Sequence, residues 1–540
     1  MRFAMYRVKL TESYFPAQTD DVILDTTVGG ILRERAALSP DAEALVEDAD
    51  NRIGRRWTYA QLLQDSERLA RALLTRYRPG ERIAVWAPNI PEWVIIEFAA
   101  AFAGLTLVTA NPANKARELK YVLEQSRSVG LLIVREHRGN PMAEIAAEVA
   151  REVPAIREVI DLNDHAALYR GEGATITFPD VKPDDPAQVQ YTSGTTGFPK
   201  GAVLHHRGLT NNARMIANRR LAAEGDTMLN FMPMFHTSGC AINTLGCVQH
   251  GGRHIISKMF DPNRALDVIE QERVVTSAGV PTMLIAMLEA QAARPRDVSS
   301  WKVSGSGGSM VPPELVRRVQ SVFGCDFGTV YGQTETSPVL TQTRHDESIE
   351  DLCETVGQPL PQIELSIRDP QTNKVVPVNA IGEICSRGYC NMIEYNDNPK
   401  ATGETIDAEG WLHTGDLGTM DERGYVKITG RVKEMIIRGG ENLFPAEIEN
   451  VLVEHPSVAE CAVVGLPDER WGEIVACFIR LNAGHALDKP ALVAHCRERM
   501  SGPKTPAQWF TVDAWPLTGS GKIQKFALRD LAVAGEVVAR

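Results

Sequence analysis

Residues 82–134 read RIAVWAPNIPEWVIIEFAAAFAGLTLVTANPANKARELKYVLEQSRSVGLLIV, and this stretch decides the class of fold. Three short apolar runs lie at 82–89, 106–112 and 130–134. They alternate with two longer segments of helical length, at 91–104 and 114–127. Strands that alternate with helices in this way are typical of a layered α/β architecture. The stretch therefore predicts an α/β fold.

The segment before this stretch, residues 57–77, predicts one further helix. Its apolar residues recur at helical spacing, at Leu62, Leu63, Leu69, Ala70, Leu73 and Leu74. Thr58 and Gln61 have the spacing of a capping box, in which each side chain bonds the other residue's backbone N–H. We expect the helix to begin directly after Thr58.

The rest of the chain divides into regions of different character. Strand candidates continue between helical segments, at 227–233, 251–257, 274–280 and 301–306. From about 355 to 430 short strands are separated by Gly, Pro and Asp turns, which predicts a mainly β portion. The last hundred or so residues contain helices and strands enough for a small α+β domain, with its boundary near 430–440.

Composition and charge exclude several classes of protein. Hydrophobic residues make up 44% of the 540-residue chain, as in ordinary globular proteins, and the formal net charge is −12. This charge argues against a broad surface for nucleic acid or anionic membrane. No apolar run is long enough for a transmembrane helix, and the N-terminus lacks the apolar core of a secretory signal. The nine cysteines include no CxxC pair, so we expect reduced thiols, no structural zinc and a cytoplasmic location.

A glycine-rich loop, YTSGTTGFPKG at 191–201, is the first candidate for a chemical role. We predict that it lies between a strand and a helix, where its backbone N–H groups form an anion-binding nest. Its hydroxyls and its lysine suit a polyphosphate. The candidate residues are Thr192, Ser193, Gly194, Thr195, Thr196, Gly197 and Lys200. The order of residues is not that of a Walker A loop, because GxxxxGK[ST] is absent.

Three later motifs occur in the order that one enzyme family requires. They are YGQTETS at 331–337, GWLHTGD at 410–416 followed by TGRVKE at 429–434, and PLTGSGKIQK at 516–525. Together with the loop at 191–201, they resemble the adenylate-forming, or AMP-binding, superfamily, in its acyl-CoA synthetase branch. The resemblance covers most of the chain, to Lys522.

The resemblance implies roles for particular residues. Tyr331 would pack on adenine, Thr334 would contact a phosphate, and Asp416 and Arg431 the ribose. Gly308 and Gly332 would contact further parts of the nucleotide. Glu335, helped by Thr195, would hold Mg²⁺, a hard cation that prefers oxygen ligands. Lys522 would be the lysine of the adenylation step.

The same resemblance implies two domains with the active site between them. Residues 1–432 would form the large domain, built from layered α/β lobes and the β-rich portion, and residues 433–540 a small mobile α+β domain. Lys433 would be the hinge between two half-reactions. Gly439 and Gly440, which have no Cβ, would let the pantetheine arm of coenzyme A pass close to the backbone.

The acyl pocket is expected along FMPMFHTSGC at 231–240 and SGSGGSM at 304–310. His236 would lie near the junction of the carboxylate and the thiol tunnel, and the smaller wall residues are Thr237, Gly239, Cys240, Ser306 and Gly307. Amino-acid-activating relatives carry an aspartate in this motif, which this chain lacks. We therefore expect a roomy pocket for an uncharged tail, of a medium- or long-chain fatty acid or of a bulkier polycyclic or aryl acid.

The expected reaction uses ATP, Mg²⁺ and coenzyme A to convert a carboxylic acid through acyl-AMP into a thioester. A carrier protein as acceptor, a luciferase-like oxygenase and a nucleotide-binding regulator without turnover are the alternatives. We expect no nucleic acid partner and no stable membrane insertion, and consider a homodimer as one assembly.

Overall fold

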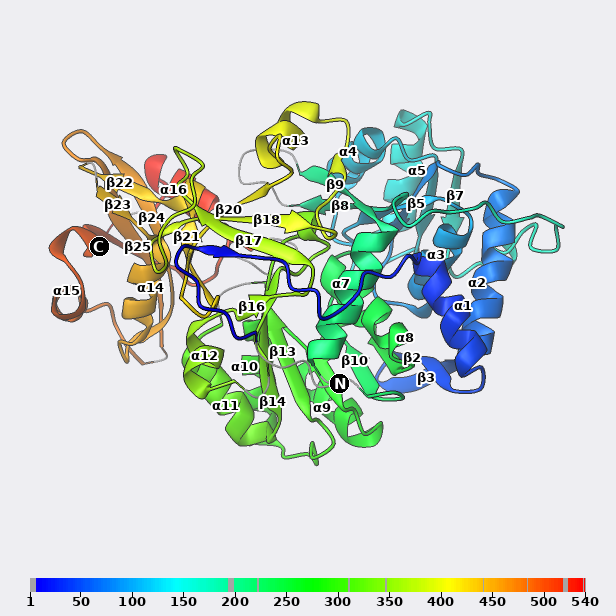
Figure 1. Cartoon of the computed structure of the whole chain (residues 1–540), viewed down its shortest axis with the longest axis horizontal. Helices are drawn as coiled ribbons and strands as arrows, with labels where there is room; N and C mark the ends of the chain where they lie inside the picture. The colour runs from blue at the N-terminus through cyan, green and yellow to red at the C-terminus, as the bar shows by residue number, and fades with distance from the viewer. Residues whose placement is uncertain are drawn as a thin grey trace.

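The described part of the chain in this computed structural model comprises residues 6–192, 199–220, 223–308, 311–344, 347–439, 441–482, 484–517, 523–537 and 539, with only the backbone at 442. These residues form four sheets. Three lie together, and the fourth, built from strands after residue 435, lies at one end of the molecule (Figure 1). The predicted fold class, a large α/β part with a β-rich portion and a small α+β part, is confirmed.

Residues 82–134 form the centre of the first sheet, whose strand order is β19-β9-β8-β5-β4-β6-β7. The strands are β4 (Arg82–Trp86), β5 (Thr106–Ala110), β6 (Gly130–Ile133), β7 (Glu158–Asp161), β8 (Pro186–Thr192), β9 (Lys200–His205) and β19 (Glu394–Tyr395). The neighbouring helices are α1 (Val28–Leu38), α2 (Tyr59–Leu74), α3 (Pro91–Phe102), α4 (Ala116–Ser126), α5 (Met142–Glu152) and α6 (His165–Leu168). Every residue of α3 is buried, as expected of a helix that is apolar apart from Glu92 and Glu97. The capping box at Thr58 and Gln61 is present, as predicted.

One local prediction is wrong. The loop at 191–201 does not lead into a helix, because residues 200–205 form strand β9, which pairs antiparallel with β8. Helix α7 (His206–Arg219) begins only after that strand. Residues 201–205 are buried, and β9 pairs with β8 along its length and with β19 at Ala202 and Val203. The glycine-rich segment therefore joins two strands of a hairpin, away from the N-terminus of α7.

The second sheet has the order β16-β15-β14-β13-β12-β10-β11-β2-β3. Its strands are β2 (Glu43–Ala49), β3 (Arg52–Thr58), β10 (Thr227–Asn230), β11 (Arg253–Ser257), β12 (Thr276–Ala278), β13 (Val303–Gly307), β14 (Asp326–Tyr331), β15 (Thr341–Gln342) and β16 (Gln358–Pro359). The helices are α7, the π-helix η1 (Ser238–Leu245), α8 (Gly246–Gln249), α9 (Pro262–Gln271), α10 (Pro281–Ala293), α11 (Pro313–Phe323) and α12 (Ile349–Glu354). Because β10, β12, β13 and β14 are parallel, the segments that follow them leave the sheet at one edge.

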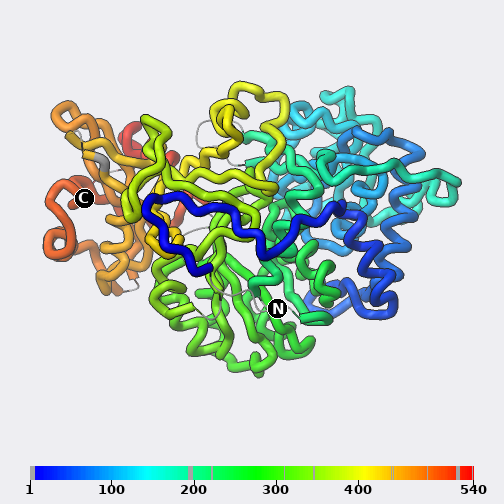
Figure 2. The backbone as a smooth tube through the Cα atoms, viewed as in Figure 1, coloured from blue at the N-terminus to red at the C-terminus, as the bar shows by residue number. Residues whose placement is uncertain are grey.

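The third sheet is the predicted β-rich portion. It contains β1 (Tyr14–Phe15), β17 (Ile363–Arg368), β18 (Gly382–Gly388), β20 (Leu412–Met420) and β21 (Val426–Arg431), all paired antiparallel. Helix α13 (Pro399–Thr405) lies beside it. Figure 2 shows the N-terminal segment crossing the middle of the molecule, where β1 pairs with β17.

The fourth sheet has the order β23-β22-β25-β24, and β26 pairs with β25. Its strands are β22 (Ile436–Arg438), β23 (Glu441–Leu443), β24 (Val458–Asp468), β25 (Gly472–Leu481) and β26 (Gln508–Thr511), and its helices are α14 (Pro445–Val453), α15 (Lys489–Arg499) and α16 (Lys525–Val533). Among the described residues, none of the helices combines the length and the apolar character needed to cross a bilayer.

Candidate active site

The carboxyl-terminal edge of the second sheet faces the third sheet and gathers several predicted site residues. Tyr331 ends β14, and Glu335 follows it in the short 3-10 helix η2 (Thr334–Thr336). Asp416 and Arg431 belong to the antiparallel strands β20 and β21, where they are register partners. Open α/β sheets bind their ligands at this edge.

Tyr331, Asp416 and Arg431 form one hydrogen-bonded group. The Tyr331 hydroxyl donates to Asp416 Oδ2 at 3.0 Å, and Arg431 Nε lies 2.8 Å from Asp416 Oδ1. Burial raises the pKa of Tyr331 well above its ordinary value, so the hydroxyl keeps its proton and donates. The charge of Asp416 raises the pKa of Arg431. A buried carboxylate is thereby fixed in orientation beside the end of β14.

Glu335 is a second buried carboxylate at this edge, 7% exposed. Its Oε1 accepts a hydrogen bond of 2.6 Å from the Tyr395 hydroxyl of β19. Burial raises the pKa of Glu335, and the Tyr395 hydrogen bond opposes that rise. Lys200, the first residue of β9, lies with Nζ 4.7 Å from the centre of the Tyr395 ring. The structure thus brings Lys200 to the same neighbourhood as Glu335, although they are far apart in the sequence.

The loop residues themselves are only partly described. Thr192 and Lys200 are paired across the β8–β9 ladder, so the two ends of the loop lie side by side. Ser193, Gly194, Thr195, Thr196 and Gly197 lie outside the described residues, and so do Gly440 and Lys522. Their roles stay predictions. Leu517 and Ile523, which flank the segment containing Lys522, form a β-bridge with each other.

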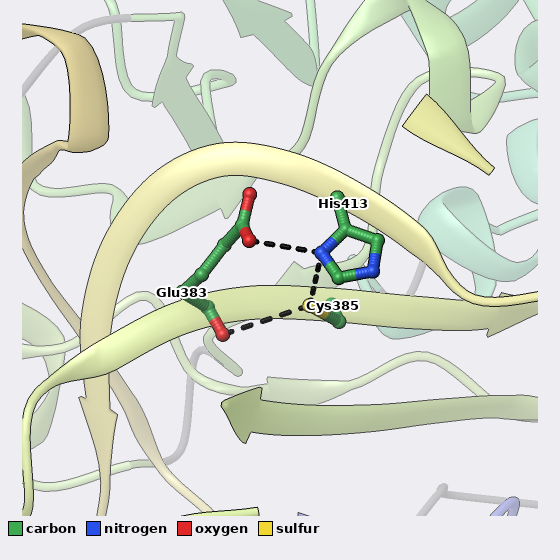
Figure 3. A group of neighbouring side chains, drawn as sticks. All are labelled: Glu383, Cys385 and His413. Atoms are coloured by element: carbon green, nitrogen blue, oxygen red, sulfur yellow. Dashed lines mark hydrogen bonds and ion pairs between the residues drawn. The ribbon is translucent and has the colours of Figure 1, made fainter. Parts of the chain in front are cut away.

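A Glu–His pair holds the turn that leads to Asp416 (Figure 3). Glu383 Oε2 lies 2.9 Å from His413 Nδ1, and Glu383 Oε1 accepts from the Gly415 N–H at 2.9 Å. Cys385 Sγ lies 3.4 Å from the same His413 nitrogen. The Glu383 hydrogen bond raises the pKa of His413. Glu383 therefore holds the turn at two residues, His413 and Gly415, and Gly415 directly precedes Asp416.

Glu383 and Cys385 are not recognisable as site residues from the sequence. Their only local signal is that both point to one side of β18, since they are two residues apart. Donor atoms of Glu383, Cys385 and His413 lie within 4.8 Å of one another, close enough to share a metal ion. Because spacing along the chain cannot reveal such a group, the expected absence of structural zinc stays a prediction.

The predicted acyl-pocket residues lie at the ends of β10 and β13. His236 Nδ1 accepts from the backbone N–H of Ser238, at 3.2 Å, and Thr237 is fully buried. Gly239 packs so tightly that a Cβ would lie 2.3 Å from the carbonyl oxygen of Pro233. Cys240 is buried, and Gln190 Nε2 donates to its sulfur at 3.2 Å.

On β13, the glycines are required by close approach and by backbone conformation. A Cβ on Gly307 would lie 2.6 Å from the carbonyl oxygen of Val330. Gly308 has φ of 78° and almost nothing near it. Ser306 is buried, and its hydroxyl has no hydrogen-bond partner in the described part of the chain. Gly332, after β14, would clash with Pro338 if it carried a Cβ.

The segment predicted to act as a hinge connects the third and fourth sheets directly. Lys433 lies in the 3-10 helix η3 (Val432–Glu434), between β21 and β22. Gly439 has φ of 60° in the turn between β22 and β23, and its N–H donates to the Trp471 carbonyl at 2.7 Å. Glu434 pairs with Lys525 of α16 at 3.3 Å.

Family models match two segments of the chain: AMP-binding enzyme over residues 32–396, and AMP-binding enzyme C-terminal domain over residues 447–522. The chain belongs to the AMP-binding enzyme family. YngI of Bacillus subtilis (strain 168) is 37% identical, over 95% of this chain and 98% of YngI. The mitochondrial medium-chain acyl-CoA ligase ACSF2 of Homo sapiens is 34% identical, over 96% of this chain and 89% of its own length.

Solved structures agree with this assignment. ATP-bound MatB from Rhodopseudomonas palustris has a TM-score of 0.86 and 27% identity, over 94% of this chain and 99% of MatB. The o-succinylbenzoate CoA synthetase MenE from Bacillus subtilis, in complex with its acyl-adenylate, has a TM-score of 0.83 and 28% identity, with the same coverage. The recognition of the family from the four motifs is therefore confirmed.

Proposed function

We propose that this AMP-binding enzyme is an ATP- and Mg²⁺-dependent acid–CoA ligase. Its substrate would be a medium- or long-chain acid or a bulkier acid. The observation that carries the proposal is the meeting of Tyr331, Asp416 and Arg431 beside the buried carboxylate of Glu335. These groups offer an acceptor for two neighbouring hydroxyls, as on a ribose, next to an oxygen ligand for a cation that accompanies phosphates.

The first step joins the acid to AMP. A carboxylate oxygen of the substrate attacks the α-phosphorus of ATP, a P–O bond forms, and pyrophosphate leaves with the electrons of the broken P–O bond. Asp416 and Arg431 hold the nucleotide through its ribose, while Lys200 and the loop at 191–201 bind the departing phosphates. Lys522 stabilises the charge that builds up between the two anions as they meet.

The residues present fit a magnesium ion. Glu335 supplies a buried carboxylate whose orientation is fixed by Tyr395, and Thr195 is predicted to add a hydroxyl, both of them hard oxygen donors. When bound, the ion would neutralise negative charge on the phosphates of ATP. Lys200, through its contact with Tyr395, places a positive charge in the same neighbourhood.

The second step transfers the acyl group. The thiol of coenzyme A releases its proton to solvent, its sulfur forms a bond to the acyl carbon, and AMP leaves with the electrons of the broken C–O bond. We propose that residues 433–540 rotate about Lys433 between the steps. Two observations support this division: among the described residues, strands after residue 435 pair only with one another, and the connection from β21 is the short segment η3. Closure of the site protects acyl-AMP from water.

The test is to incubate a panel of acids with ATP, Mg²⁺ and coenzyme A and to follow pyrophosphate, AMP and thioester by mass spectrometry. We expect thioester and AMP in equal amounts. Accumulation of acyl-AMP without thioester would instead favour transfer to a carrier protein, and release of light with oxygen would favour a luciferase-like oxygenase. Nucleotide binding without any pyrophosphate release would contradict both steps.

A further inference from the structure

Glu383, Cys385 and His413 bring three different kinds of metal-binding atom together, near the starts of β18 and β20 (Figure 3). The donor atoms all lie within 4.8 Å of one another. Cys385 and His413 are register partners across the two antiparallel strands. Glu383 lies two residues before Cys385 and therefore on the same side of β18. The group is thus supported by paired strands, which fix the positions of its side chains.

Two of the donors converge on a single nitrogen. Glu383 Oε2 lies 2.9 Å and Cys385 Sγ 3.4 Å from His413 Nδ1. Around a tetrahedral zinc ion, whose bonds are about 2.0–2.3 Å long, neighbouring donor atoms are about 3.4–3.6 Å apart. The distance between Cys385 and His413 already fits, and that between Glu383 and His413 would have to widen by about half an ångström. A small side-chain rotation therefore opens the space for an ion.

Groups that orient the imidazole and the carboxylate are already in place. His413 Nε2, the nitrogen that faces away from the group, lies 3.5 Å from Asp407 Oδ2. Asp407 is itself held, because its Oδ1 accepts from the Trp411 N–H at 2.9 Å. Glu383 Oε1 accepts from the Gly415 N–H at 2.9 Å, which leaves Oε2 for an ion. Histidines that bind a metal usually donate their second N–H to a carboxylate, as the Asp407 contact allows here.

An ion can reach the group from solvent. The side chains of His413 and Glu383 are 20% and 13% exposed, whereas Cys385 is fully buried behind them. The neighbouring cation is Arg368, the register partner of Glu383 on β17. Its guanidinium lies 4.1 Å from the centre of the Trp411 ring, and no ion pair joins it to Glu383 among the described residues. The Glu383 carboxylate is therefore available to a metal ion.

We propose that Glu383 Oε2, Cys385 Sγ and His413 Nδ1 bind one divalent ion of the zinc class, with water as the fourth ligand. Sulfur and imidazole donors favour Zn²⁺ over Mg²⁺, which prefers oxygen ligands. On binding, the Cys385 thiol and the N–H at His413 Nδ1 each release a proton to solvent. The inference differs from the expectation of no structural zinc, which rested on spacing along the chain. It does not depend on the proposed ligase function.

The ion would add to a structure that exists without it. In its absence His413 and Glu383 keep their hydrogen bond, so the metal-free protein folds. Any dependence of stability on pH that arises from this bond then belongs to the metal-free protein. With the ion bound, the two strands are joined at a point three residues before Asp416. The site thus differs from the predicted magnesium site at Glu335, which offers hard oxygen donors.

The test adds Zn²⁺ or Co²⁺ to chelator-treated protein in the presence of excess Mg²⁺. Elemental analysis after dialysis should find one zinc ion per chain, and Co²⁺ should give a sulfur-to-metal charge-transfer band in the near ultraviolet. Zn²⁺ should raise the melting temperature, because an ion that binds only the folded state stabilises it. Protein that retains no ion, or that binds Co²⁺ without the sulfur band, would overturn the proposal.

Variants locate the ion. Cys385→Ser should abolish the cobalt band, and Asp407→Asn should keep the band but weaken zinc binding about 10- to 100-fold, as expected when a partner of a metal-bound histidine is lost. Cys353→Ser, which removes a buried thiol on α12, is the control and should change neither readout. His413→Gln provides an independent loss of binding, and the melting temperatures of the metal-free variants show that they fold. Equal zinc affinity in wild type, Cys385→Ser and His413→Gln would place the ion elsewhere and overturn the proposal.

Discussion

Asp416 and Arg431 face each other across β20 and β21, with 2.8 Å between the carboxylate Oδ1 and the guanidinium Nε. Asp416→Asn removes the negative charge that pairs with Arg431 and accepts a hydrogen bond from the Tyr331 hydroxyl. Because hydrogen bonds to charged groups are the strong ones, we expect KM for ATP to rise roughly 10- to 100-fold, with a smaller change in kcat. Steady-state kinetics of pyrophosphate release checks this. Glu422→Gln, an exposed charge on the same hairpin, is the control and should change neither constant.

Gly307 is expected to tolerate no side chain. In Gly307→Ala the added Cβ would lie 2.6 Å from a backbone oxygen of β14, which cannot move like a side chain. We expect a loss of about 1–3 kcal/mol in the free energy of unfolding and a reduced rate of adenylation. Gly403→Ala is the matched control. Gly403 lies within α13 with nothing within 4 Å of a new Cβ, and alanine there should stabilise by about 0.5–1 kcal/mol. Equal stabilities of the two variants in urea denaturation would refute the steric argument.

The Glu383–His413 pair should make stability depend on pH. The Glu383 hydrogen bond raises the folded-state pKa of His413 above the value of an unfolded histidine, so the protonated form is favoured on folding. Its contribution is fully present below the unfolded pKa, near 6.5, and is lost as the pH rises through the folded pKa. Asp407, 3.5 Å from His413 Nε2, adds to the same effect.

Glu383→Gln keeps an acceptor for His413 but removes the charge. The difference in free energy of unfolding between this variant and wild type should therefore be largest below about pH 6.5, as long as the carboxylates stay ionised, and shrink towards alkaline pH. Urea denaturation at a series of pH values measures it. A difference that stays constant with pH would mean that neutral His413 makes the bond.

Lys522 is predicted to act in only one of the two half-reactions. Lys522→Ala should lower the rate of pyrophosphate release about 10²–10³-fold, by analogy with the loss of one preorganised charge in other enzymes. Thioester formation from supplied acyl-AMP should remain largely intact. Lys400→Ala, an exposed lysine, is the control and should affect neither step. Equal loss of both steps in folded Lys522→Ala protein would defeat the assignment.

Lys433→Pro should have the opposite pattern. Proline fixes φ and restricts rotation of the segment that joins β21 to β22, so the step that requires domain movement slows. We expect adenylation to continue while thioester formation from acyl-AMP falls. Separate single-turnover measurements of the two steps decide this, and unchanged rates for both would place the hinge elsewhere.

Prediction from the sequence succeeded where the signal is local. Helix α2 begins after Thr58, as its capping box indicated, and residues 82–134 form the alternating strands and helices that their apolar pattern predicted. It failed at residues 200–205, which form β9. Strand pairing with β8 and β19 decided their conformation there, and neither partner is recognisable from the segment itself.

The sequence by itself determined the α/β class, the regions of different architecture and, through four motifs, the family. These features depend on the order and spacing of neighbouring residues, which determine the local backbone structure directly. Only the tertiary structure decided that Asp416 is held by Tyr331 and Arg431 and that Glu383 supports the turn before it. Each of these relationships depends on contacts between segments that are far apart in the sequence. Burial at these contacts determines which partners a charged group needs.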